Sequence, residues 1–169
     1  MKADQAQKAE RVAANKAAGK NHTDADFEIL VEKSKGKVGA ALNHVSANTM
    51  SICINVRKRP LFDKEYAKGE IDAVSASNPS IVVHEPKFKV DGITKYINDT
   101  AFEFDNTFNE NENSQDMYQF SIRDLLPTIF ENGIVTCFAY GQTGSGKTFT
   151  VNAITKYAIN DIFKIAGNK

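Results

Sequence analysis

The sequence has little of several residues that define whole classes of protein. It contains no tryptophan and only two cysteines, Cys53 and Cys137, among its 169 residues. Both cysteines lie in apolar, strand-like runs, and no cluster of histidine or cysteine accompanies them. This pattern excludes a disulfide scaffold and a thiolate metal site, so we expect two small buried side chains in a reducing compartment.

An excess of one charge and long hydrophobic runs are also missing. The formal net charge is zero, so no overall field attracts a nucleic acid or a membrane, and we expect neither as a partner. No apolar run approaches the roughly 18 residues of a transmembrane helix. The N-terminus lacks the apolar core of a signal peptide, so we expect the chain to stay inside the cell.

The composition changes along the chain and predicts three regions. Residues 1–25 are rich in alanine, lysine and glutamine and have almost no large apolar side chain, which predicts a frayed or disordered basic arm. Residues 26–50 are expected to form a helix and a linker. Residues 51–169 are long enough to bury a core and are expected to form the globular domain.

The linker region contains one helix signal. Asp24 or Asp26 is a suitable N-cap for a helix over roughly 27–42, in which apolar residues recur with partial helical spacing. Gly36 and Gly39 weaken that helix.

The globular region alternates strand and helix patterns, which predicts an α/β fold. Short β-branched or alternating runs predict strands at 52–57, 81–85 and 101–105, with a loop at 86–96. The continuous apolar run 134–140 predicts a strand that is buried on both faces.

Two helices are predicted in the same region. Residues 115–132 have helical spacing, Pro127 is expected to kink this helix, and Gly133 suits the left-handed position after it. The residues from Lys147 to the C-terminus predict one closing helix.

A glycine-rich loop lies between the apolar run and the closing helix. Its eight residues fit the pattern G-x-x-x-x-G-K-[ST] in full, and they are Gly141, Gln142, Thr143, Gly144, Ser145, Gly146, Lys147 and Thr148. Glycines let successive backbone N–H groups point at phosphate oxygens, and the helix adds its positive end. The Lys147 ammonium is expected to contact the phosphates, and the Thr148 hydroxyl to ligate Mg²⁺.

Hydrolysis of a nucleotide requires more than this loop. A carboxylate on the Mg²⁺ side and a group that positions water normally come from segments beyond the loop. After Thr148 the only acidic residue is Asp161, inside the closing helix. The pattern therefore predicts nucleotide binding, and we expect no catalytic residue for turnover in this chain.

Three motifs together resemble the first part of a kinesin motor domain. They are "VRKRPL" at 56–61, "FDNTF" at 104–108 and "FAYGQTGSGKTFT" at 138–150, in the order and at the separations found in kinesins. The resemblance covers about residues 50–163. It implies an α/β P-loop NTPase fold of kinesin-motor type, of which this chain carries the N-terminal half of the central sheet with flanking helices. It also implies ATP and Mg²⁺ as cofactors.

The resemblance assigns roles around the nucleotide base. Arg57, Arg59 and Pro60 would line the adenine pocket, where a flat guanidinium and a rigid ring flank a base. Phe149 would place its ring against the adenine. The alternative for Phe149 is ordinary core packing.

A further stretch, "VHEPKFKVDGITKYIND" at 83–99, resembles a loop of the kinesin-13 class, whose members depolymerise microtubules. Lys89, Val90 and Asp91 would press on curved tubulin at the tip of this loop. The alternative is an exposed turn that contacts nothing. Three lysines, Lys33, Lys35 and Lys37, would belong to a positively charged neck that holds the acidic microtubule surface. The implied location is the microtubule cytoskeleton of the cytoplasm.

Departures from the family leave three functions open. The excursion that kinesins carry after "GKTFT" is missing, and neither N-x-x-S-S-R-S-H nor D-L-A-G-S-E occurs in the sequence. We favour the N-terminal portion of a kinesin-13-like motor that couples ATP hydrolysis to depolymerisation or movement. The alternatives are a truncated, non-hydrolysing protein that binds tubulin or a partner, and an unrelated small P-loop enzyme such as a nucleoside kinase.

Overall fold

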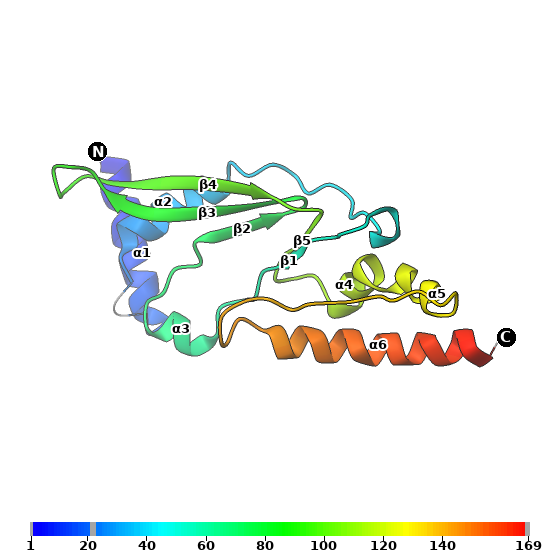
Figure 1. The fold of residues 1–169 in the computed structure, drawn as a ribbon. Coiled ribbons are helices and arrows are strands. Elements are labelled where there is room, and N and C mark those ends of the chain that lie inside the picture. Colours follow the sequence, from blue (N-terminus) through cyan, green and yellow to red (C-terminus); the bar gives the residue numbers. More distant parts are fainter. Residues whose placement is uncertain (1, 21–22, 168–169) are drawn as a thin grey trace.

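A computed structural model describes residues 2–20 and 23–167 and has the expected mixed α/β fold with a partial sheet (Figure 1). Strands β2, β3 and β4 form an antiparallel sheet in that order, and β1 pairs in parallel with β5. The helical elements are α1 (Lys2–Ala17), α2 (Ala25–Lys35), η1 (Ala47–Thr49), α3 (Asp63–Ala67), α4 (Ser114–Ser121), η2 (Arg123–Leu125), α5 (Leu126–Ile129) and α6 (Lys147–Gly167). The strands are β1 (Asn55–Arg57), β2 (Val74–Ser77), β3 (Ser80–Phe88), β4 (Lys95–Glu103) and β5 (Asn106–Phe108).

Helix α1 is not the frayed arm that the composition predicted. It forms a helical hairpin with α2, held by polar contacts: Asn15 donates to the buried Glu28 at 2.7 Å, Lys8 pairs with Asp26 at 2.7 Å, and Arg11 pairs with Glu32. The prediction counted only apolar side chains, and the packed face of α1 is made of amides and charges. Exposed ion pairs of this kind contribute about 0–1 kcal/mol each, so the buried amide–carboxylate contact is the stronger one.

Helix α2 starts where the sequence predicted and ends earlier. The Asp24 carboxylate accepts hydrogen bonds from the N–H groups of Asp26 and Phe27, which confirms the N-cap. The predicted helix to residue 42 is wrong, because α2 stops at Lys35 with Gly36 as its C-cap. From there the chain runs without regular structure to η1.

Only residues 89–94 of the predicted loop over 86–96 form a turn, because 86–88 belong to β3 and 95–96 to β4. Strands β3 and β4 stay paired from Ser80↔Glu103 to Phe88↔Lys95, well beyond the end of β2. The His84 N–H donates to the Ala73 carbonyl, so Pro86, two residues on, directs its nitrogen to the same side after β2 has ended. A proline therefore fits this strand without the loss of a ladder hydrogen bond.

The predicted helix over 115–132 is broken into α4, η2 and α5. Pro127 lies in the first turn of α5, which confirms an interruption there. The left-handed residue is Asn132, with φ of 61°, and not Gly133 as predicted. Gly133 is needed for space instead, because a Cβ there would lie 2.3 Å from Thr128 Cγ2.

The predicted buried strand at 134–140 is wrong. The segment pairs with no strand in the described ranges, and Ile134, Phe138 and Tyr140 are 90%, 89% and 102% exposed. It runs back along α6 before the chain turns into that helix (Figure 1). Cys137 is exposed with it, against the prediction of a buried thiol, whereas Cys53 is half-buried. An apolar run becomes a strand only where neighbouring strands supply hydrogen bonds and cover.

The core lies where the two small sheets meet the flanking helices. Phe108 of β5 is fully buried, and Tyr118 of α4, Leu126 of α5 and Val31 of α2 are buried as well. His84 is also fully buried, with Nε2 2.8 Å from Ser75 Oγ and Nδ1 2.7 Å from the Asp99 carboxylate. Both ring nitrogens are therefore satisfied, as expected of a structural core histidine.

Candidate functional site

The phosphate loop connects the exposed segment to α6. Gly141, Gly144 and Gly146 have φ of 148°, 82° and 96°, values that other residues rarely adopt. A Cβ at Gly141 would also lie 2.6 Å from Ser145 Oγ. The helix opens with the hydrogen bond from Thr150 N to the Gly146 carbonyl, directly after the loop. The glycines that the sequence singled out are therefore required by the loop's backbone.

Lys147 lies folded over this loop. Its Nζ donates to the carbonyl oxygens of Gly141 and Gln142, both at 2.7 Å. These acceptors are neutral, whereas a phosphate oxygen would form a charge-assisted and stronger hydrogen bond. Thr148 lies in the first turn of α6 and is exposed. The ammonium and the hydroxyl thus lie at the start of the helix, where the positive end of the helix favours an anion.

A cavity of about 550 Å³ adjoins the loop. This volume is within the usual range of small-molecule sites. Its lining combines Gln142, Thr143, Gly144 and Ser145 of the loop with Arg57, Arg59, Phe62, Lys64 and Glu65 from the β1–α3 region. The structure therefore brings together the loop and the arginine pair, which are far apart in the sequence.

Arg57 lies at the end of β1 and faces α6. Its guanidinium carbon is 5.3 Å from the centre of the Phe149 ring, and its Nη1 donates to Ser114 Oγ at 2.9 Å and Thr150 Oγ1 at 3.3 Å. Burial lowers the pKa of Arg57, and the nearby negative charge of Glu112 opposes that shift. Phe149 is 67% exposed, so it is available to a ligand and is not packed in the core.

Arg59 has a different environment. Both of its terminal nitrogens donate to the Glu65 carboxylate at 2.8 Å, Nη1 also donates to the Pro60 carbonyl, and its guanidinium lies 4.2 Å from the Phe62 ring centre. Hydrogen bonds from Arg59 and then from Phe62 N lower the pKa of Glu65 to about 2. Arg59 therefore lines the cavity with its positive charge already paired with Glu65.

The sequence analysis missed several residues of this site. Phe62 is the N-cap of α3, and Lys64 and Glu65 lie in this helix, which is too short to show periodicity. An acidic residue three positions after the N-cap, here Glu65, is a helix N-terminus signal. Ser114 and Glu112 contact Arg57 across more than 50 residues of sequence, and no local pattern marks them.

The predicted tubulin-facing residues lie elsewhere, at the tip of the β3–β4 hairpin (Figure 1). Val90 is completely exposed. The Asp91 carboxylate accepts hydrogen bonds from the N–H groups of Ile93 and Thr94 at 2.9 and 2.8 Å, and Gly92 has φ of 69°. Asp91 and Gly92 thus build the turn, and Lys89 and Val90 are the residues that it presents.

A second sequence candidate, the basic group Lys33, Lys35 and Lys37, is not a free positive surface. Lys35 Nζ lies 2.7 Å from the Asp72 carboxylate, which it shares with Lys58. Lys37 contributes to lowering the pKa of Asp99, after the hydrogen bond from His84. Part of this charge is therefore offset within the chain.

The part of the chain that the structure describes has neither a cluster of metal-ligand side chains nor a membrane-spanning helix. Residues 2–20 and 23–167 contain no group of three or more histidine, cysteine or acidic side chains placed to hold a metal ion. No described helix is long and apolar enough to cross a membrane. Asp161 is bonded to Tyr118 and Lys164, about 20 Å along α6 from Lys147 by helical rise. It is therefore too far from the phosphate loop to act on a bound nucleotide.

Comparisons with known proteins agree with this geometry. The sequence matches the kinesin motor domain family over residues 57–169, which includes the arginine pair, the cavity and the phosphate loop. It is also 38% identical over 150 residues to a curated protein described as "Diatom spindle kinesin-1" from Cylindrotheca fusiformis. That match covers 85% of this chain and 24% of the relative, so the chain spans about a quarter of the relative's length. Neither comparison supports the kinesin-13 class in particular.

Proposed function

Because this chain belongs to the kinesin motor domain family, we propose that it binds Mg·ATP at residues 141–148 and is part of a microtubule-associated motor. The observation that carries the proposal is the cavity shared by the glycine-rich loop and the two arginines. The family match excludes the alternative of an unrelated small P-loop enzyme.

The residues on the phosphate side fit the cofactor. The loop backbone adopts conformations that only glycine favours, and Lys147 Nζ is held by two carbonyl oxygens that phosphate oxygens would replace. Gln142, Thr143 and Ser145 complete the loop, and Thr148 is the residue that would hold Mg²⁺. Bound Mg·ATP supplies the phosphoanhydride bond whose hydrolysis drives motors of this family.

The residues on the base side also fit. Arg57 and Phe149 form a cation–π pair at the edge of the site, and each offers a flat surface to an adenine. Arg59, fixed by Glu65, and the adjoining Pro60 would flank the base on the side of α3. These contacts hold and orient the nucleotide and transfer no proton.

We extend the proposal to the other regions of the chain. Residues 51–169 would form part of the motor domain, 26–50 would be a neck-like segment, and 1–25 a basic arm, now with α1 packed on α2. Lys89, Val90 and Asp91 would contact tubulin, and the location would be the cytoplasmic microtubule cytoskeleton. A kinesin-13-like depolymerase is the finer form of this proposal, supported by the exposed hairpin tip.

A second candidate function is a protein that binds nucleotide and tubulin without hydrolysis. The position of Asp161, bonded to Tyr118 and remote from the phosphate loop, favours it for this chain. The two candidate functions differ in whether ATP is hydrolysed. ATPase activity of the purified chain would support the motor, and nucleotide binding without hydrolysis would support the second candidate.

The nucleotide site is tested by thermal unfolding with and without Mg·ATP. A ligand at about one hundred times its dissociation constant adds roughly 2.7 kcal/mol to a folded protein that binds it. We expect this stabilisation in the unmodified chain and its loss in Lys147→Ala, because the Lys147 ammonium is the cation that lies on the loop backbone.

The matched control is Lys156→Ala, which removes the same charge from an exposed position on the same helix. It should keep the stabilisation by Mg·ATP. Equal stabilisation of Lys147→Ala and the unmodified chain would contradict the proposed site.

A further inference from the structure

Arg57 is oriented by a group of contacts outside the cavity. Besides Ser114 and Thr150, its Nη2 lies 3.4 Å from the backbone carbonyl of Glu112. The Glu112 carboxylate is also the charge that raises the pKa of Arg57 against the effect of burial. Glu112 therefore acts on Arg57 in two ways, through a backbone acceptor and through its negative charge.

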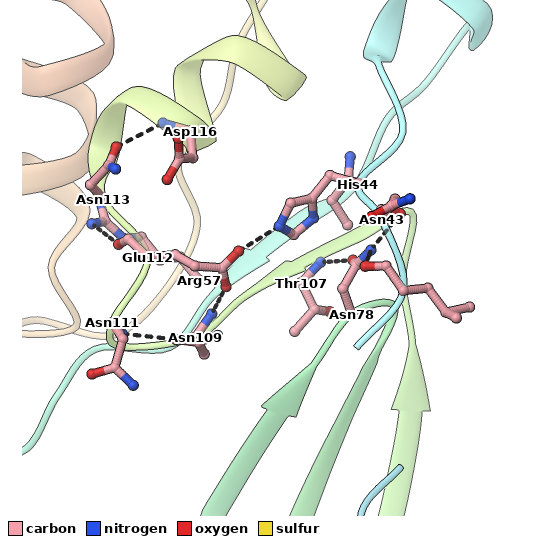
Figure 2. A network of polar contacts seen from close by, with 12 residues as sticks. Asn43, His44, Arg57, Asn78, Thr107, Asn109, Asn111, Glu112, Asn113 and Asp116 are labelled. Carbon is pink, nitrogen blue, oxygen red and sulfur yellow. Dashed lines mark hydrogen bonds and ion pairs between the residues drawn. The ribbon is translucent and has the colours of Figure 1, made fainter. Parts of the chain in front are cut away.

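Glu112 is itself fixed at both carboxylate oxygens. Oε1 lies 2.5 Å from His44 Nε2, and Oε2 accepts a hydrogen bond from the N–H group of Asn109 at 2.6 Å (Figure 2). The second bond closes the turn between β5 and α4, so the side chain sets the course of its own backbone. The carbonyl that meets Arg57 belongs to this closed turn.

His44 has a single polar contact and two aromatic ones. Its ring stacks on the fully buried Phe108, with centres 4.3 Å apart and 21° between planes, and lies 5.1 Å from the Phe120 ring. Its Nδ1 is buried and has no hydrogen-bond partner among the described residues. In this arrangement the Nε2–H of His44 is donated to Glu112, because Nε2 has an acceptor and Nδ1 has none among the described residues.

The segment that carries His44 is pinned by side chains from the sheet side. We call residues 42–46 the strap. Asn78 donates to the carbonyls of Leu42 and Asn43 and also accepts from Thr107 N, as Figure 2 shows. Further along, Asn106 exchanges two hydrogen bonds with the backbone of Val45, each at 2.8 Å. His44 is therefore held in place by its backbone as well as by its ring.

We propose that Glu112 and His44 are positioning residues for the base side of the nucleotide site. His44 orients Glu112, Glu112 holds the guanidinium of Arg57, and Arg57 keeps its plane against Phe149 where the adenine binds. The inference rests on the proposed nucleotide site. It adds that the strap, far from the phosphate loop in sequence, determines base affinity.

The proposed positioning role predicts different effects of the same substitutions on base binding and on phosphate binding. Glu112→Gln removes the charge at nearly constant volume, and His44→Phe keeps the stacking on Phe108 while it removes the hydrogen bond. Both should weaken binding of Mg·ATP about threefold to tenfold, the usual effect of losing one hydrogen bond. Both should leave binding of Mg·tripolyphosphate, which has no base, unchanged.

The experiment is isothermal titration of the full chain with Mg·ATP and with Mg·tripolyphosphate. Ser46→Ala is the matched control, because it removes a strap hydrogen bond to Asp124 and does not touch Glu112. A selective loss of ATP affinity in Glu112→Gln and His44→Phe, absent in Ser46→Ala, would support the positioning role.

Three other results have distinct meanings. Unchanged affinity for both ligands in both variants would overturn the inference. A parallel loss of both ligands would overturn it as well, because it would show a purely structural role. Failure of the unmodified chain to bind either ligand would instead contradict the proposed nucleotide site.

Discussion

Arg57 and Arg59 are two residues apart and line the same cavity, yet their electrostatic surroundings are opposite. Alternation along an extended chain places residues i and i+2 on one side, which explains their shared face. Arg57 meets neutral oxygens and an aromatic ring, and burial lowers its pKa. Hydrogen bonds to Glu65 raise the pKa of Arg59. Arg57 is therefore held through neutral acceptors, whereas the charge of Arg59 is already paired with a carboxylate.

The Glu65 carboxylate provides a pH test of this pair. Its pKa in the folded chain is lowered to about 2, first by Arg59 and then by Phe62 N, from an ordinary value of 4.5. A depressed folded pKa means that the interaction contributes fully above the unfolded value and is lost as the pH falls toward about 2. We expect the carboxyl resonance of Glu65, followed by NMR, to titrate near that value.

The control for this titration is Arg59→Ala, which should return the Glu65 midpoint most of the way to its ordinary range. An unmodified chain in which Glu65 titrates near 4.5 would show that the bidentate pair does not persist in solution.

At the scale of elements, the β3–β4 hairpin extends past the end of β2. Helix α2 braces its end, because the Phe27 ring meets Phe88 edge-on at 5.2 Å and Lys95 pairs with Asp24 and Asp26. These contacts join the strand ends that flank the turn at residues 89–94. The hairpin tip is thus supported from one side by the N-terminal helices.

The tip residues have separable roles, which gives a test of tubulin binding. Lys89→Ala with Val90→Ala removes the presented side chains and keeps the Asp91 turn, so we expect tubulin co-sedimentation to weaken at least about fivefold. Stabilisation by Mg·ATP should not change, because the tip is remote from the phosphate loop.

Lys156→Ala serves as the charge-matched control for this double variant. Equal co-sedimentation of the double variant and the unmodified chain would assign any tubulin binding to another surface.

At the scale of the whole molecule, apolar side chains of segment 134–140 and of α6 are exposed. The segment 134–140 exposes apolar side chains in both directions, and no described residue of α6 is buried. Ile159 and Phe163 of α6 are 47% and 73% exposed. Contiguous apolar surface of this kind promotes association, and an unpaired extended segment adds free backbone hydrogen-bonding groups.

We therefore expect the isolated chain to bind a hydrophobic dye such as ANS and to self-associate as its concentration rises. Phe138→Ser combined with Phe163→Ser should reduce both effects, as measured by dye fluorescence and light scattering. Val12→Ser, which changes a single exposed apolar residue on α1, should alter neither. A monomeric chain that binds no dye at its highest attainable concentration would contradict this expectation.

The sequence by itself determined the features that depend on short-range geometry. Gly141, Gly144 and Gly146 predicted the phosphate loop because the necessary φ values exclude most other residues. Asp24 predicted the start of α2, and the residues from Lys147 onward predicted the closing helix α6, because helix caps and helix propensity involve neighbours in the chain. The three motifs at 56–61, 104–108 and 138–150 also predicted the family.

Only the tertiary structure decided the features that depend on distant residues. It placed Arg57 against Phe149, joined α1 to α2 through polar side chains, and brought His44 to Glu112. It also left 134–140 exposed, although the same apolar residues predicted a buried strand. The physical reason is that burial and strand pairing belong to a residue's neighbours in space, and the residue types along a segment do not specify those neighbours.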